Sequence, residues 1–122
     1  MSLTHRRDDG IDVVSLPERL VMANAGDARA ELKQIIQAGS GKVVINLGDT
    51  EFMDSSGLAV VVAGLQAARK LDGDLYLAQM SDTIRALFEL TRLHTVFQIF
   101  DDEGAAVRAF GHRATAARGH GH

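Results

Sequence analysis

The sequence has 122 residues but no cysteine and no tryptophan, only one tyrosine and a single proline, Pro17. The lack of cysteine excludes disulfide bonds, thiol nucleophiles and thiolate metal sites. The scarcity of large aromatic residues argues against an aromatic ligand cage. With 13 Lys and Arg against 16 Asp and Glu, the formal net charge of −3 gives no general reason to bind nucleic acid or an anionic membrane.

Long apolar stretches are also missing. The longest apolar run, residues 58–65, is too short to cross a bilayer, and the N-terminal residues have no apolar core of a signal peptide. We therefore expect a cytoplasmic protein without direct membrane insertion.

Several catalytic and cofactor-binding motifs are absent as well. No glycine-rich dinucleotide loop follows a strand, and neither a P-loop nor a G-x-S-x-G nucleophile elbow occurs. The sequence predicts a protein that is not an enzyme and that has no cofactor.

Apolar periodicity and turn signals alternate along the chain. Strands are expected at residues 11–16, 43–47, 75–78 and 96–100, with a weak partner strand within 3–8, and helices at 24–38, 56–71, 82–91 and shortly after 101. This alternation predicts an α/β fold with a single domain, in which about four helices flank a mainly parallel central sheet of four to five strands. We place the domain at residues 1–110 and a flexible C-terminal tail at 111–122, where no large apolar residue occurs.

Local signals mark the ends of these elements. Asp9 and Gly10 form a two-residue hairpin signal, and Asn24 is expected to cap the first helix. Asp101 is expected to cap the last helix, where the acidic residues that follow suit the positive end of the dipole.

The histidines and acidic clusters do not predict a metal site. His120 and His122 lie in the glycine-containing tail and are interpreted as solvated residues. His94 follows a predicted helix, and we interpret it as a polar residue at a helix C-terminus rather than as a catalytic base.

The most informative segment follows the buried strand that ends at Leu47. A loop leads there to Asp54, Ser55, Ser56 and Gly57 at the start of a helix. The first turn of a helix carries unpaired N–H groups that favour an anion, and Gly57 is expected to leave the backbone beside the serines open. We predict phosphorylation of Ser55, with Ser56 as the second choice. The simpler alternative is that a serine here serves only as an N-cap.

The helix that follows has no polar side chain over residues 58–65. An ordinary surface helix keeps a polar face, so this helix is either covered by its neighbours or presents an apolar surface to a partner. Both interpretations stay open from the sequence. If the second holds, the partner surface comprises residues of this helix and of the chain before the first helix: Ala59, Val62, Ala63, Met22 and Asn24.

The segment Phe52–Leu58, FMDSSGL, closely resembles the signature of the STAS domain family, and the best match within it is to the bacterial anti-sigma factor antagonists. The resemblance covers about residues 11–110. It implies a protein that binds an anti-sigma factor which is also a serine kinase of the GHKL type. It further implies that the kinase phosphorylates Ser55, that the phosphorylated form releases the kinase, and that a PP2C-like phosphatase restores binding.

Two positions depart from this family pattern. Members usually carry a glycine and an aspartate before the first helix, where this chain has Glu18 and Val21. STAS domains also occur in other assemblies. The alternatives are therefore a constitutive interaction module in a sensory or transport complex and a domain that binds a small molecule or nucleotide.

Overall fold

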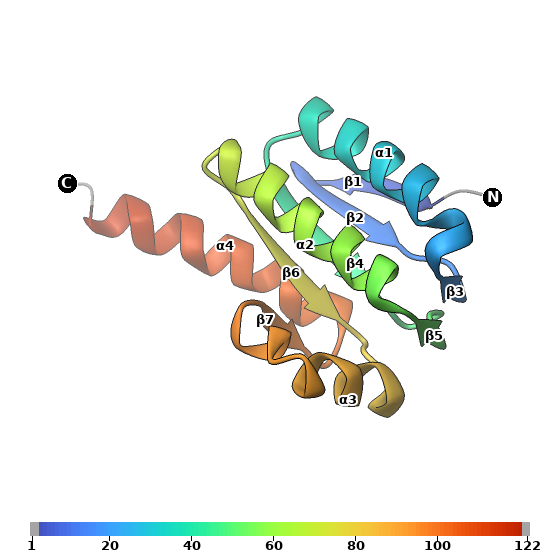
Figure 1. Ribbon diagram of the computed structural model, residues 1–122. Helices are drawn as coiled ribbons and strands as arrows, with labels where there is room; N and C mark the ends of the chain where they lie inside the picture. Colours follow the sequence, from blue (N-terminus) through green and yellow to red (C-terminus); the bar gives the residue numbers. More distant parts are fainter. Residues whose placement is uncertain (1–2, 121–122) are drawn as a thin grey trace.

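A computed structural model describes the backbone of residues 3–120 and the side chains of residues 3–111. Its centre is a five-stranded sheet in the order β1-β2-β4-β6-β7, in which β1 is antiparallel to β2 and all other neighbours are parallel (Figure 1). The strands span Thr4–Asp8, Ile11–Ser15, Lys42–Asn46, Asp74–Ala78 and Gln98–Phe100 for β1, β2, β4, β6 and β7. The predicted α/β fold with a mainly parallel sheet is confirmed.

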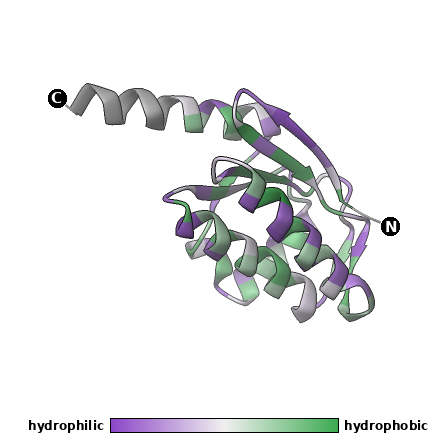
Figure 2. Ribbon diagram, turned by 90° about the horizontal axis from the view of Figure 1, so that it is seen from above, coloured by the Kyte–Doolittle hydropathy of each residue, from purple (hydrophilic) through white to green (hydrophobic). Residues whose placement is uncertain are grey.

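Helices cover both faces of the sheet. The helices α1 (Met22–Ala38), α2 (Ser55–Lys70) and α3 (Asp82–Leu90) lie on one face, and α4 (Glu103–His120) lies on the other (Figures 1 and 2). The three-helix side contains the larger core. On the α4 side, the ring of Phe110 stacks on Tyr76 with 4.0 Å between ring centroids. Buried side chains on both faces explain why the central strands are almost wholly apolar.

A second, two-stranded sheet forms at the carboxyl ends of the parallel strands and is absent from the sequence prediction. In it, β3 (Arg19–Leu20) pairs in parallel with β5 (Phe52–Met53), with Leu20 opposite Met53. Each strand has only two residues, which is too short for a periodic signal. Because α1 begins two residues after β3 and α2 begins two residues after β5, this pairing brings the first turns of both helices together.

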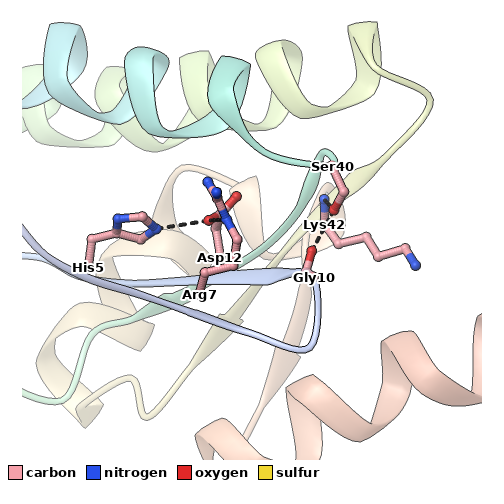
Figure 3. A network of polar contacts seen from close by, with 6 residues as sticks. All are labelled: His5, Arg7, Gly10, Asp12, Ser40 and Lys42. Atoms are coloured by element: carbon pink, nitrogen blue, oxygen red, sulfur yellow. Dashed lines mark hydrogen bonds and ion pairs between the residues drawn. The ribbon is translucent and has the colours of Figure 1, made fainter.

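The two strands of the β1–β2 hairpin are joined through the fully buried carboxylate of Asp12 (Figure 3). Its Oδ1 atom accepts a hydrogen bond of 2.7 Å from Arg7 Nε and lies 2.8 Å from His5 Nε2. Gly39, which ends α1 as the sequence predicts, packs against the other oxygen. A Cβ at position 39 would lie 2.0 Å from Asp12 Oδ2, so this position requires glycine.

Two predicted helix caps are wrong by a few residues. Val21, not Asn24, is the N-cap of α1, and the Asn24 amide bridges backward by accepting from Val21 N and donating to Arg19 O, both at 2.8 Å. At α4 the capping carboxylate belongs to Asp102, whose Oδ1 accepts from the backbone N of Ala105 at 2.7 Å. At α1 the asparagine side chain bonds the backbone of the residues before it, and at α4 either of two adjacent aspartates fits the cap and the second one takes it.

The last helix is longer than predicted. The sequence predicts a short helix followed by a tail over 111–122, whereas α4 continues to His120. Alanine and arginine have high helix propensity and no proline interrupts the segment, so the lack of large apolar residues does not end the helix. The division of the chain at residue 110 stays a prediction, and His122 lies outside the described residues.

Candidate functional site

Asp54 organises the site between the first turns of α1 and α2. As N-cap of α2, its Oδ1 atom accepts hydrogen bonds from Ser56 N at 2.9 Å and Gly57 N at 3.1 Å. Its Oδ2 atom accepts a third from Met22 N, at 3.0 Å, at the start of α1. One carboxylate therefore caps two helices, and it serves at α1 because the N-cap residue Val21 has no side-chain acceptor.

These donors hold Asp54 in its charged form. Partial burial raises the pKa of the Asp54 carboxyl, but the hydrogen bonds from the backbone N–H groups of Met22, Gly57 and Ser56 together outweigh it, and the pKa lies below the usual value. The prediction that these N–H groups are free to attract an external anion is wrong, because Asp54 already uses them. A phosphate on the neighbouring serine must extend outward instead.

The double cap gives a pH-dependent prediction. A carboxyl group whose folded-state pKa is depressed contributes stability above its unfolded pKa of 3.8, and this contribution is lost as the pH falls through the folded value. We expect Asp54→Asn to lower the denaturation midpoint at neutral pH, and the difference from the parent to shrink as the pH falls below about 4. Urea denaturation across this pH range measures it. Asp49→Asn, an exposed carboxylate of the preceding loop, is the control, and an equal effect of the two variants would contradict the cap assignment.

Ser55 is the accessible hydroxyl of the pair. It is the first residue of α2 and is exposed, and no hydrogen bond of its hydroxyl occurs among the described residues, whereas Ser56 is half-buried. The interpretation of either serine as the N-cap is wrong, because Asp54 takes that position. An exposed hydroxyl with no structural task is the kind of group that a kinase can reach.

Gly57 has a different task from the one predicted. It is buried, and a Cβ at this position would lie 2.4 Å from the carbonyl oxygen of Leu20 and 2.4 Å from Cγ of Met53. The residue therefore does not open the backbone beside the serines to solvent. It lets the first turn of α2 pack directly onto β3, which keeps Asp54 within reach of α1.

Most of the apolar surface of α2 is covered by its neighbours. Only Ala59 is exposed within the apolar run, while Val62 and Ala63 are half-buried and Val62 packs on the core. The residues of the helix that are buried are Gly57, Leu58, Val60, Val61, Gly64, Leu65 and Ala68. The alternative that neighbouring elements cover the helix thus accounts for the larger part of its apolar pattern.

The remainder forms a shallow depression next to Ser55, which we call the Ser55 depression. The predicted residues Ala59, Val62 and Ala63 line it, together with residues that the sequence did not indicate: Arg29 of α1, and Thr91 and Leu93 beyond α3. Sequence spacing relates residues within one helix but not between helices, so no signal in the chain points to these three.

Two exposed apolar side chains lie at the start of the helices. Met22 is 77% exposed, and Phe52, in β5 shortly before Ser55, is 44% exposed with the Arg19 guanidinium 4.7 Å from its ring centroid. Asn24 is half-buried and its amide is engaged at the start of α1, so of the predicted surface residues Met22 is more available than Asn24.

In the described part of the chain, no histidine lines the Ser55 depression. His94 has Nδ1 at 3.4 Å from the carbonyl oxygen of Phe88, which agrees with its interpretation as a polar residue at the end of a helix. Within residues 3–120 no helix is long and apolar enough to cross a membrane, and among the side chains of residues 3–111 no three His, Asp or Glu group as metal ligands.

Known proteins resemble this chain over nearly its whole length. BtrV of Bordetella bronchiseptica, whose name describes an anti-sigma factor antagonist, is 31% identical over 110 residues, which are 90% of this chain and 95% of BtrV. A STAS domain protein from Planctomyces limnophilus superposes with a TM-score of 0.83 at 19% identity, covering 91% of this chain and 99% of that one. The Bacillus protein SpoIIAA in its phosphorylated form superposes with a TM-score of 0.70 at 22% identity, covering 88% and 98%. The STAS domain family model matches residues 2–106, and the chain belongs to the STAS domain family.

Proposed function

We propose that the protein is a cytoplasmic anti-sigma factor antagonist that is switched by phosphorylation of Ser55. In its unmodified form it binds an anti-sigma factor that is also a GHKL-type serine kinase, and a PP2C-like phosphatase reverses the modification. The observation that carries the proposal is the exposed Ser55 hydroxyl at the edge of an open depression, in a family whose curated relatives are named as anti-sigma factor antagonists.

The switch is electrostatic and local. A phosphate on Ser55 adds about −1.5 to −2 charges at neutral pH. The N-terminus of α2 favours this charge by roughly 0.3–1 kcal/mol, whereas the ionised Asp54 beside it opposes the charge. Because these local effects partly cancel, the fold persists and the consequence falls on a partner that must cover the dianion.

Affinity capture followed by phosphosite mass spectrometry tests the proposal. The tagged chain is expected to recover a protein with a GHKL kinase domain from the source bacterium, and part of the cellular pool is expected to carry phosphate on Ser55. Recovery of the same partner under all growth conditions, with no phosphoserine, would instead support a constitutive interaction module. Stabilisation of the purified chain by GTP, ATP or phosphate in a thermal-shift panel would support a small-molecule function.

The Ser55 depression gives a second test, through its exposed alanine, Ala59. Ala59→Glu places an unpaired charge in the proposed interface and is expected to weaken kinase binding about tenfold or more, with little change in thermal stability. Ala30→Glu, an exposed alanine of α1 outside the depression, is the matched control. Calorimetric titration measures both, and equal affinities for the two variants would remove the depression from the interface. Val62 is a weaker probe, because its contact with the core adds a stability change.

A further inference from the structure

A second depression continues from the Ser55 depression along the groove between α1 and α2. The two depressions share Arg29, Ala63 and Gln66. The second is also lined by Lys33 of α1 and by Lys70 near the end of α2, and we call it the basic groove. It places three positive charges on one face of a protein whose formal net charge is −3.

The cations of the basic groove are not neutralised by the protein itself. Arg29, Lys33 and Lys70 are exposed, and none of them forms an ion pair or hydrogen bond within the described residues. No acidic side chain lines either depression. The two acidic residues of α1, Asp27 and Glu31, line neither depression, and the Glu31 carboxylate accepts a hydrogen bond from Leu3 N at 3.2 Å.

From this arrangement we infer that the basic groove binds an acidic segment of the partner protein, as an extension of the interface at Ser55. The inference rests on the proposed function, because the same partner spans both depressions. Charge complementarity identifies the occupant: a run of Asp or Glu side chains pairs with the three cations, and small apolar residues of the segment pack on Ala63 and Ala67.

The shape of the groove favours a protein segment over a small anion. Ser55 and Lys70 are 15 residues apart on α2, a distance of about 22 Å along the helix axis. A helical segment of about 15 residues or an extended one of about 7 residues spans this length. The three cations are spread along two helices instead of converging on one point, which suits a row of carboxylates better than a single small anion.

The continuity of the two depressions also connects the basic groove to the switch. Of the three cations of the basic groove, Arg29 is the one that also lines the Ser55 depression. A phosphate on Ser55 attracts Arg29 and thereby competes with the acidic segment for it. Phosphorylation then acts on the partner twice, by placing a dianion in the interface and by neutralising part of the groove.

Charge reversal at Lys33 tests the inference with the purified kinase recovered by affinity capture as the probe. Lys33→Glu is expected to lower the affinity of the unphosphorylated protein at least about tenfold and to reduce the dependence of the affinity on salt. The matched control is Arg108→Glu, which makes the same charge change on α4, on the opposite face of the sheet, and is expected to alter affinity less than about twofold. Equal losses for the two variants would mean that only the net charge matters and would overturn the groove assignment.

Zero-length carbodiimide cross-linking gives an independent measurement of the chemistry of the occupant. Lys33 and Lys70 are expected to couple to Asp or Glu residues of one contiguous segment of the kinase. Cross-links absent from both lysines, or displacement of the kinase by millimolar inorganic phosphate at constant ionic strength, would overturn the inference.

The two proposals fail in different ways. If the kinase loses affinity for the Ser55→Asp variant but binds the Lys33→Glu variant like the parent, only the basic-groove proposal is contradicted. If Lys33→Glu lowers the affinity of the kinase but Ser55→Asp does not change it, only the phosphorylation switch is contradicted. If no kinase is recovered, both proposals are contradicted.

Discussion

Phosphorylation of Ser55 is expected to reduce the affinity for the anti-sigma factor kinase by more than a hundredfold. The hydroxyl is exposed at the first turn of α2, and the nearest backbone donors are already bonded to Asp54, so the phosphate has no set of free N–H groups to neutralise it. A partner that covers this point must bury or face a dianion that Arg29 compensates only in part, which costs roughly 3–4 kcal/mol. Ser55→Asp carries less charge and is expected to show part of the effect.

Titration calorimetry with the purified kinase measures this prediction. Ser55→Ala is expected to bind like the unmodified parent and to resist release when kinase and ATP are present together. Ser81→Asp is the matched control, because Ser81 caps α3 and aspartate is an equally good N-cap. If Ser55→Asp and Ser55→Ala both bind like the parent, the electrostatic switch is wrong. Thermal denaturation of the variants is expected to differ little, since the fold does not depend on this hydroxyl.

The sheet and its helices could be predicted from the sequence because burial of one or both faces of an element produces a regular pattern of apolar residues. The strand over 43–47 is apolar at nearly every position since helices cover both faces of the sheet, and the hairpin at Asp9 and Gly10 is confirmed by the positive φ of both residues. Ser81, which directly precedes the helix predicted at 82–91, caps α3 by accepting from Ile84 N at 3.2 Å. Each of these features is set by residues that are close in the sequence.

What the sequence did not reveal are contacts between distant segments. Asp54 bonds to Met22 across 32 residues, and the two-residue strands β3 and β5 that make this possible have no periodic pattern. The same holds for Arg29, which shares a depression with Ser55 although it lies on another helix. The motif DSSG thus marks the start of α2 and the exposed serine, but not the second helix that the aspartate caps.

The glycine of that motif shows most clearly how a correct residue was assigned the wrong physical task. An open backbone beside a modified serine is a reasonable expectation for glycine at a helix start. The structure instead places Gly57 against Leu20, at a separation that leaves no room for a side chain. The requirement for glycine therefore comes from β3, which precedes Gly57 by more than 30 residues. Glycine is needed here for close packing, and not to expose the backbone beside the serines.

Gly57→Ala is accordingly expected to destabilise the protein although alanine favours helices. The added Cβ would lie 2.4 Å from the Leu20 carbonyl oxygen, and backbone atoms cannot rotate aside as a flexible side chain can. Overpacking of this kind costs about 1–3 kcal/mol, which exceeds the gain of up to about 1 kcal/mol in helix propensity. Urea denaturation of parent and variant measures the difference in the free energy of unfolding.

Gly26→Ala is the matched control for this prediction, since Gly26 lies within α1 and a Cβ there meets no atom within 4 Å. That variant is expected to be as stable as the parent or more stable, by up to about 1 kcal/mol. If Gly57→Ala were equally stabilising, the first turn of α2 would not press on β3 and the double cap by Asp54 would lose its structural basis. If it is destabilising, the same shift of the turn is expected to displace Asp54 and Ser55 and to slow phosphorylation, so that one methyl group links the packing of the two helices to the switch.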